Sequence, residues 1–225
     1  MKTHTRVVVI GGGVVGCSVL YHLTKLGWSD VMLLERSELT SGSTWHAAGG
    51  FHTLNADTNM AALQGYTIRL YKELEEITGM SCGLHHVGGV TLADTPERMD
   101  FLKAERAKHR FMGLETEIVS PEEIVKLAPI TNVDGVIGGL YDPLDGHLDP
   151  SGTTHAYAKA ARMAGAEIVL RNPVLETNQR GDGTWDVVTK DGTIHAEHVV
   201  NAGGLWAREV GAMAGLYLPL HPMEH

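Results

Sequence analysis

The sequence predicts an α/β protein, and three features of the chain support this class. The apolar run "RVVVI" leads into a glycine-rich turn and then into a stretch whose apolar residues have helical spacing. A second apolar run, "VMLL", follows, so the chain opens with a strand–helix–strand unit. Further along, strand-like and helix-like segments alternate, and several short strands lie near the end.

The opening unit is bounded by clear signals. The first strand is expected at Val7–Ile10 and the second at Val31–Leu34, and Gly27 ends the helix between them. One face of that helix should pack inward, because its apolar residues recur at helical spacing. This face carries Val15, Val19, Leu23 and Leu26.

A helix of roughly 20 residues is predicted before Gly79, since six larger side chains share one face. They are Met60, Leu63, Tyr66, Leu70, Leu74 and Ile77. The segment "VGGVTLADTPE" then indicates a strand and the start of a second helix, Glu97–Met112, with Thr95 as its N-cap and Pro96 at its first position.

The next elements are shorter. "SPEEIVKLAP" predicts a helix that opens with a capping box of Ser120 and Glu123. "GVIGGLYDP" indicates a strand, and "DPSGTTHAYAKAARMAG" a helix that Gly165 ends. "AEIVL", "TWDVVT" and "TIHAEHVVNAGG" are predicted strands, and "KDG" joins the last two in a hairpin.

Composition and charge exclude several classes of protein. The formal net charge of -9 and the scattered basic residues argue against nucleic acid as a partner. No apolar run is long enough to span a membrane, and no secretory signal is evident. Two cysteines are too few for a disulfide scaffold. These features predict a cytoplasmic protein.

The glycine turn has the spacing of a dinucleotide-binding motif. Gly11, Gly13 and Gly16 form G-x-G-x-x-G between a strand and a helix, which is the context the motif requires. Glu35 follows at the end of the second strand, where a carboxylate hydrogen-bonds ribose hydroxyls and disfavours a 2′-phosphate. FAD and NAD both remain possible, and the later short strands favour FAD.

Several longer segments carry a resemblance to a known family. "VVIGGGVVGCSVLYHLTKLG", "LLERSELTSGSTWHAAGG", "GLYDPLDGHLDP", "GTWDV" and "VVNAGGLWAREVG" together resemble the dimethylglycine dehydrogenase and sarcosine dehydrogenase family, flavoproteins of the D-amino-acid-oxidase type. The resemblance covers essentially the whole chain. It implies a Rossmann-like FAD-binding domain, with a βαβ unit and a β-meander, interleaved with part of a mixed-sheet substrate domain.

The resemblance also implies an order of domains. FAD-binding parts are expected at residues 1–79 and 146–225, and part of the substrate domain at residues 80–145. The chain stops at "LYLPLHPMEH" without a closing helix or strand, so we expect it to be the N-terminal portion of a longer protein. Tetrahydrofolate is a possible cofactor of C-terminal domains that family members often carry.

The site residues follow from the same resemblance. In the family, the histidine of the S-T-W-H segment is bonded to FAD through a methyl group on the flavin's benzenoid ring, and His46 holds that place here. Further contacts with FAD are expected along the chain. They involve Arg36, Ser43, Thr44, Val174, Ala202, Gly203 and Gly204.

The implied reaction is the FAD-dependent demethylation of an N-methyl amino acid, such as dimethylglycine or sarcosine, by hydride transfer to the flavin. His225 matches an active-site histidine of the family and is the predicted catalytic residue. The electron acceptor is a flavoprotein or oxygen. Alternatives are another amine oxidase of the same type, a sarcosine oxidase subunit, or a non-catalytic FAD-holding module.

The closing "HPMEH" also has the H-x-x-E-H spacing of a zinc site. That motif needs a helix, which places His221 and His225 on one face. Pro219 and Pro222 favour an extended run instead. We therefore predict no metal site.

Overall fold

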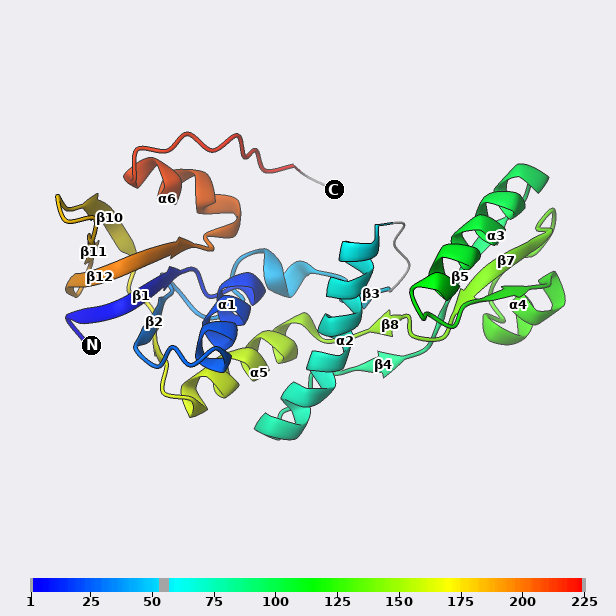
Figure 1. Cartoon of the computed structure of the whole chain (residues 1–225), viewed down its shortest axis with the longest axis horizontal. Coiled ribbons are helices and arrows are strands. Elements are labelled where there is room, and N and C mark those ends of the chain that lie inside the picture. Colours follow the sequence, from blue (N-terminus) through cyan, green and yellow to red (C-terminus); the bar gives the residue numbers. More distant parts are fainter. Residues whose placement is uncertain (1, 53–56, 224–225) are drawn as a thin grey trace. The chain divides into compact units, whose positions relative to one another are not determined.

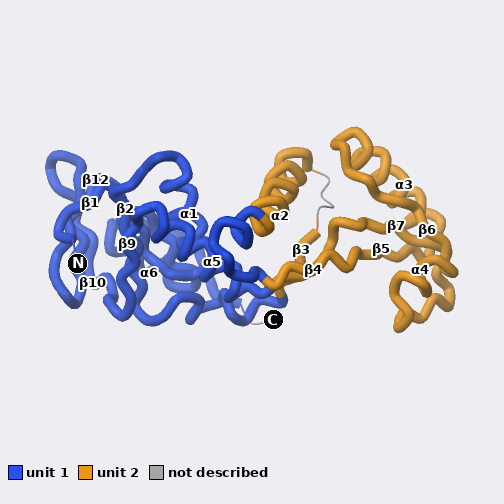
Figure 2. Tube along the Cα trace, turned by 90° about the horizontal axis from the view of Figure 1, so that it is seen from below, with its two compact units in different colours: residues 1–48, 73–82, 149–225 blue, residues 49–72, 83–148 orange. Residues whose placement is uncertain are grey.

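The computed structural model describes residues 2–52 and 57–223. Its contacts divide the chain into two compact units, shown in different colours in Figure 2. The first unit comprises residues 1–48, 73–82 and 149–225, and the second comprises residues 49–72 and 83–148.

The first unit is built on a six-stranded mixed sheet with the strand order β10-β11-β12-β1-β2-β9. Neighbours from β12 to β9 are parallel, whereas β10, β11 and β12 form an antiparallel meander. The strands are β1 (His4–Ile10), β2 (Val31–Leu34), β9 (Glu167–Val169), β10 (Val174–Gln179), β11 (Trp185–Thr189) and β12 (Gly192–Asn201). The predicted α/β class with a βαβ unit and a meander is therefore confirmed.

The register of this sheet aligns three strand ends. Ile10, the last residue of β1, pairs with Leu34 at the end of β2 and with Asn201 at the end of β12. Because the three strands are parallel, the segments that follow them leave the sheet at the same edge. The glycine turn, Glu35 and the "AGG" run are thus brought to one place.

The described part of the first unit also contains helices (Figure 1). Helix α1 (Val14–Lys25) packs against β1, β2 and helix α5 (Pro150–Met163), while the shorter α6 (Ala207–Met213) contacts β10 and β12. The core lies between these helices and the sheet. Its fully buried side chains include Val8, Met32 and Ile194.

The predicted inward face of α1 is wrong at both ends. Val15 is 62% exposed and Leu26 is 76% exposed. The side chains that α1 buries are Cys17, Leu20 and Tyr21 instead. Cys17 is fully buried, and α1 contacts α5, β1 and β2.

The second unit holds two three-stranded antiparallel sheets, of orders β3-β8-β4 and β5-β7-β6. Helix α3 packs on the second of these sheets, and α4 contacts its central strand. Helix α2 (Thr58–Thr78) begins in this unit. The other elements are β3 (Gly50–Phe51), β4 (His85–His86), β5 (Gly89–Ala93), α3 (Pro96–Phe111), β6 (Glu117–Val119), α4 (Pro121–Leu127), β7 (Gly138–Asp142) and β8 (Gly146–His147).

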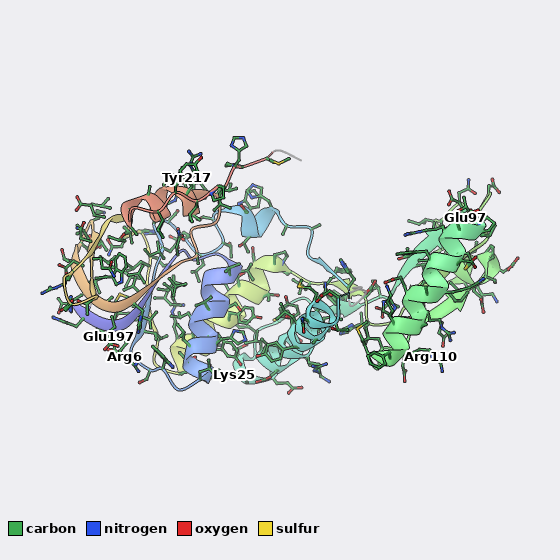
Figure 3. The ribbon with its side chains drawn as sticks, turned by 45° about the horizontal axis from the view of Figure 1, so that its top comes forward. Arg6, Lys25, Glu97, Arg110, Glu197 and Tyr217 are labelled. Atoms are coloured by element: carbon green, nitrogen blue, oxygen red, sulfur yellow. The ribbon has the colours of Figure 1, made fainter. Side chains whose placement is uncertain are left out.

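Both predicted caps are confirmed in the second unit. The side chain of Thr95 accepts a hydrogen bond from the backbone N–H of Arg98. Ser120 and Glu123 form the full capping box at the start of α4. Helix α3 also carries Glu97 in its first turn and Arg110 near its last, the arrangement that its dipole favours (Figure 3).

The apolar face predicted for α2 is only partly buried. Leu70 and Leu74 are buried, but Met60, Leu63 and Ile77 are exposed. No helix among residues 2–52 and 57–223 combines the length and the apolar content needed to cross a membrane.

Candidate functional site

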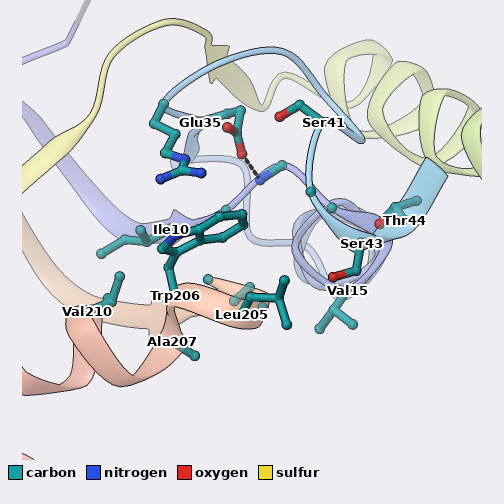
Figure 4. Close-up of a pocket in the computed structure, with 18 of the residues that line it drawn as sticks. Ile10, Val15, Glu35, Ser41, Ser43, Thr44, Leu205, Trp206, Ala207 and Val210 are labelled. Carbon is teal, nitrogen blue, oxygen red and sulfur yellow. Dashed lines mark hydrogen bonds between the residues drawn. The ribbon is translucent and has the colours of Figure 1, made fainter. Parts of the chain in front are cut away.

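A cavity of about 560 Å³ lies in the first unit, where β1, β2 and β12 end (Figure 4). That volume is within the range of pockets that hold small molecules and cofactors. The lining comes from the glycine turn, the segment after β2, the start of β10 and the segment after β12. The cavity therefore lies at the carboxyl edge of a parallel sheet, where open α/β sheets bind their ligands.

The glycine turn is tightly enclosed. Gly11 has a φ of +117°, and a Cβ atom there would lie 2.3 Å from the carbonyl oxygen of Ala202. A Cβ at Gly16 would lie 1.9 Å from the carbonyl oxygen of Gly11. Gly16 does not line the cavity, so its role is to let α1 pack on the turn, whereas Gly11 and Gly13 form the wall itself.

Glu35 holds this turn in place. Its Oε2 accepts a hydrogen bond of 2.7 Å from the backbone N–H of Gly12, drawn as a dashed line in Figure 4, and its Oε1 accepts one of 2.8 Å from Ser37 N–H. A carboxylate has about four acceptor positions, so two remain for hydroxyl donors such as those of a ribose. The side chain is buried and lines the cavity.

The segment after β2 closes over the start of α1. The backbone N–H of Thr40 donates to the carbonyl of Gly12, and the N–H of Val14 donates to Oγ1 of Thr44 at 3.0 Å. The first N–H groups of a helix have no partner within the helix and attract anions. Ser43 and Thr44 bring two hydroxyls to this end of α1, and both residues line the cavity.

An aromatic side chain and a cation form another part of the wall. The guanidinium carbon of Arg36 lies 3.8 Å from the centroid of the Trp206 ring. Trp206, Val210 and Val174 line the same cavity. Flat apolar surfaces next to a guanidinium suit the stacking of a planar heterocycle such as adenine.

The segment after β12 is fixed by the side chain of Asn201. Its Oδ1 accepts from Gly203 N–H at 3.1 Å, and its Nδ2 donates to the carbonyl of Ala207 at 2.8 Å. The backbone N–H of Ala202 donates to the carbonyl of Ile10. Ala202, Gly203 and Gly204 all line the cavity, and their small size lets a ligand approach the backbone.

His46 lies at the edge of this cavity rather than in its lining. It ends the short 3₁₀ turn Ser43–His46, and its neighbours Thr44 and Ala47 both line the cavity. Nδ1 of His46 lies 3.1 Å from the carbonyl oxygen of Gly42. A carbonyl only accepts hydrogen bonds, so Nδ1 carries the proton and, in the neutral ring, Nε2 keeps its lone pair. Nε2 is therefore the nucleophilic atom of this side chain.

Most of the predicted cofactor contacts are brought together. Gly11, Gly13, Glu35, Arg36, Ser43, Thr44, Val174, Ala202, Gly203 and Gly204 line the cavity. His225, the predicted catalytic residue, lies outside the described residues. The roles of all these residues remain predictions.

The sequence interpretation missed several lining residues. Gly12 lies inside the glycine motif. Leu205, Trp206, Ala207 and Val210 lie within "VVNAGGLWAREVG", a segment that carries the family resemblance. Ser41 lies in "LLERSELTSGSTWHAAGG", which also carries the family resemblance, whereas Pro173 lies in a loop outside all of the segments that carry it. Among the described residues, no group of three or more His, Cys, Asp or Glu side chains is placed to hold a metal ion.

The residues around the cavity fit FAD. The glycine wall leaves no room for a Cβ at Gly11, the start of α1 faces the turn, and Glu35 keeps acceptor positions free. A βαβ unit with this glycine turn at its carboxyl edge defines a dinucleotide-binding protein of the α/β class.

Comparison with known proteins narrows this class. The chain belongs to the family of FAD-dependent oxidoreductases that is described as "DAO: FAD dependent oxidoreductase", which it matches over residues 6–225. It is 46% identical, over 224 residues, to the mitochondrial dimethylglycine dehydrogenase of Rattus norvegicus, and 42% identical, over 231 residues, to the mitochondrial sarcosine dehydrogenase of Homo sapiens. These matches cover 100% of this chain, but only 26% and 25% of the two relatives.

A solved structure agrees with the fold. The crystal structure of L-proline dehydrogenase from P. horikoshii matches with a TM-score of 0.88 and 28% sequence identity, and the match covers 96% of this chain and 57% of that one. The chain thus has the fold of an FAD-binding oxidoreductase and spans about a quarter of the length of its two dehydrogenase relatives.

Proposed function

We propose that the protein oxidises an N-methyl amino acid, such as dimethylglycine or sarcosine, with FAD as its cofactor. The identity of 46% to a dimethylglycine dehydrogenase, which extends over all of this chain, carries the proposal. The cavity supports the proposal, because its walls suit a dinucleotide. Most of these walls come from the segments that carry the glycine motif and the family resemblance.

Different parts of FAD are proposed to meet different walls of the cavity. The ribose hydroxyls would donate to the free acceptor positions of Glu35, and the adenine would lie beside Val174, Arg36 and Trp206. The pyrophosphate would meet the glycine turn and the start of α1, with the hydroxyls of Ser43 and Thr44 as donors. The flavin would then extend toward the turn that carries His46.

His46 is the proposed attachment point for the flavin. Its Nδ1 is held by the carbonyl of Gly42, and the lone pair of Nε2 is free to form the bond. A covalent link keeps the cofactor on the protein through each cycle of reduction and oxidation. The link also explains why a histidine lies in this turn. The other residues of the turn are mostly small and suit a close approach of the backbone to a ligand.

The proposed reaction requires little acid–base catalysis by the protein. When bound, FAD accepts the hydride that leaves the N-methyl carbon of the substrate. The chain must bind the amine, exclude water and favour the neutral amine, and His225 is the proposed group for that last task. The proposed substrate-binding part lies in the second unit, which comprises residues 49–72 and 83–148. The sequence predicts residues 80–145 for this role, and that boundary stays a prediction.

Other features of the whole protein are proposed from the family resemblance. The electron acceptor is a flavoprotein or oxygen, and tetrahydrofolate is the proposed cofactor of any C-terminal domains. Both dehydrogenase relatives are mitochondrial, so the location in the cytoplasm that the sequence predicts stays a prediction.

Anaerobic reduction tests the proposed reaction. Full-length protein is mixed with dimethylglycine, sarcosine or glycine without oxygen, and the flavin absorbance is followed. We expect bleaching with an N-methylated amino acid and none with glycine, which lacks the methyl group. The proposal would be contradicted if dithionite reduces the flavin but none of the N-methyl amines does. That result would favour a non-catalytic module.

A further inference from the structure

Trp45 has an unusual environment for a tryptophan. It is 58% exposed, and it does not line the cavity, although it lies between lining residues in the turn Ser43–His46. Its ring lies on the imidazole of His46, with 3.9 Å between the centroids and 37° between the planes. Core packing does not account for so large a side chain at this position.

The two contacts of His46 act on different parts of its ring. The hydrogen bond from Nδ1 to the Gly42 carbonyl fixes one edge, and the indole of Trp45 covers one face. An exposed histidine without these contacts would sample several rotamers, and ordering its side chain would cost conformational entropy. In this turn, the imidazole is already ordered with Nε2 available.

We propose that Trp45 is a positioning residue for the covalent attachment of FAD. The inference rests on the proposed link at His46. Trp45 holds the imidazole so that Nε2 meets the flavin methyl carbon without further ordering. Its electron-rich face also stabilises the positive charge that the ring carries until Nδ1 loses its proton.

Covalent attachment is a two-electron oxidation. Nε2 of His46 bonds to the methyl carbon, the methyl group loses one hydrogen and Nδ1 loses its hydrogen. The two protons and two electrons released reduce dioxygen to hydrogen peroxide. Trp45 takes part in none of these transfers, so its removal should slow attachment and leave the product unchanged.

The test measures how fast flavin becomes covalently bound. Full-length protein made in riboflavin-starved cells is mixed with FAD in air, and samples are precipitated with acid at intervals. Trp45→Leu keeps apolar bulk without a ring, and Trp45→Phe keeps a ring. Phe111→Ala removes an exposed aromatic side chain from α3 as a control. The affinity for FAD before attachment is measured by flavin fluorescence.

We expect Trp45→Leu to attach flavin about tenfold more slowly, which corresponds to about 1.4 kcal/mol in the barrier. Trp45→Phe should recover most of the rate, and Phe111→Ala should match the unmutated protein. All variants should bind FAD with similar affinity before attachment, because Trp45 does not line the cavity.

Three results would overturn the inference. Equal rates for Trp45→Leu and the unmutated protein would show that the stacked ring is irrelevant. Loss of FAD affinity or of folding in both Trp45 variants would show a structural role. An unmutated protein that never attaches flavin would overturn the link at His46 as well, and this outcome is distinct from the other two.

Discussion

Gly11 carries a steric constraint that the neighbouring strand imposes. Its φ of +117° lies in a region that only glycine adopts freely, and the carbonyl of Ala202 occupies the space of a Cβ. The G-x-G-x-x-G spacing predicts such a constraint in general terms. Only the register of β1 with β12 shows which backbone atom imposes it, because that contact joins residues far apart in the sequence.

Substitution of Gly11 tests this contact. Gly11→Ala should lower the free energy of unfolding by about 2–4 kcal/mol and weaken FAD binding, since the turn must shift to admit the methyl group. Gly27→Ala is the matched control. It also has a positive φ, but no atom lies within 4 Å of its Cβ position, so we expect a loss of about 1 kcal/mol and unchanged FAD binding. Urea denaturation measures the free energy of unfolding, and flavin titration measures the affinity for FAD. Equal losses of stability in the two variants would disprove the clash at Gly11.

Trp206 shows why part of the site escaped prediction. The sequence marks "AGG" as a close-approach segment but gives no sign that the guanidinium of Arg36 lies against the ring of Trp206. The contact joins a residue after β2 to one after β12 and depends on the alignment of both strands with β1. Tertiary register, rather than local pattern, decides it.

Among the secondary-structure elements, strands that are buried on both faces of the sheet were easy to predict. The predicted strand Val31–Leu34 is confirmed because all four of its residues are buried, which gives an unbroken apolar run. Strand β10, "VLETNQ", was missed because most of its side chains are polar and it lies at the edge of the sheet. The faces of α1 and α2 were predicted from large apolar residues, although small side chains such as Cys17 and Ala61 are among the buried ones.

The cap of α3 gives a prediction at this scale. Thr95→Ala removes the acceptor for Arg98 N–H and should lower stability by about 1 kcal/mol. Thr67→Ala is the control, since its hydroxyl only donates to the carbonyl of Leu63 within α2, and its loss should cost less than about 0.5 kcal/mol. Chemical denaturation followed by circular dichroism compares them. An equal effect of both substitutions would argue against the cap.

At the scale of the whole molecule, the two cysteines report on the packing of the first unit. Both side chains are fully buried, and burial raises the pKa of Cys17 to about 12 and that of Cys82 to about 11. Both thiols therefore stay protonated in the folded protein at pH 8. They are unreactive in this form, because the thiolate is the nucleophile. The folded state binds these protons more tightly than the unfolded state, whose thiols have a pKa near 9.0.

The stability from the two protonated thiols is complete below about pH 9 and is lost as pH rises through 11 toward 12. At pH 8, we expect iodoacetamide to leave both residues unmodified in the folded protein and to alkylate them rapidly in urea. Mass spectrometry of the peptides decides this, and fast alkylation of Cys17 without urea would mean that α1 is not packed as described.

The central claim is that FAD occupies the cavity and is bonded to His46. The most direct measurement is acid denaturation of the full-length protein, then trypsin digestion and fragmentation of the flavin-bearing peptide. We predict that the flavin stays on the polypeptide, within peptide 37–69, and is assigned to His46 rather than to His52. His46→Ala should release it. Free flavin from the unmutated protein, or attachment at His52, would contradict the claim.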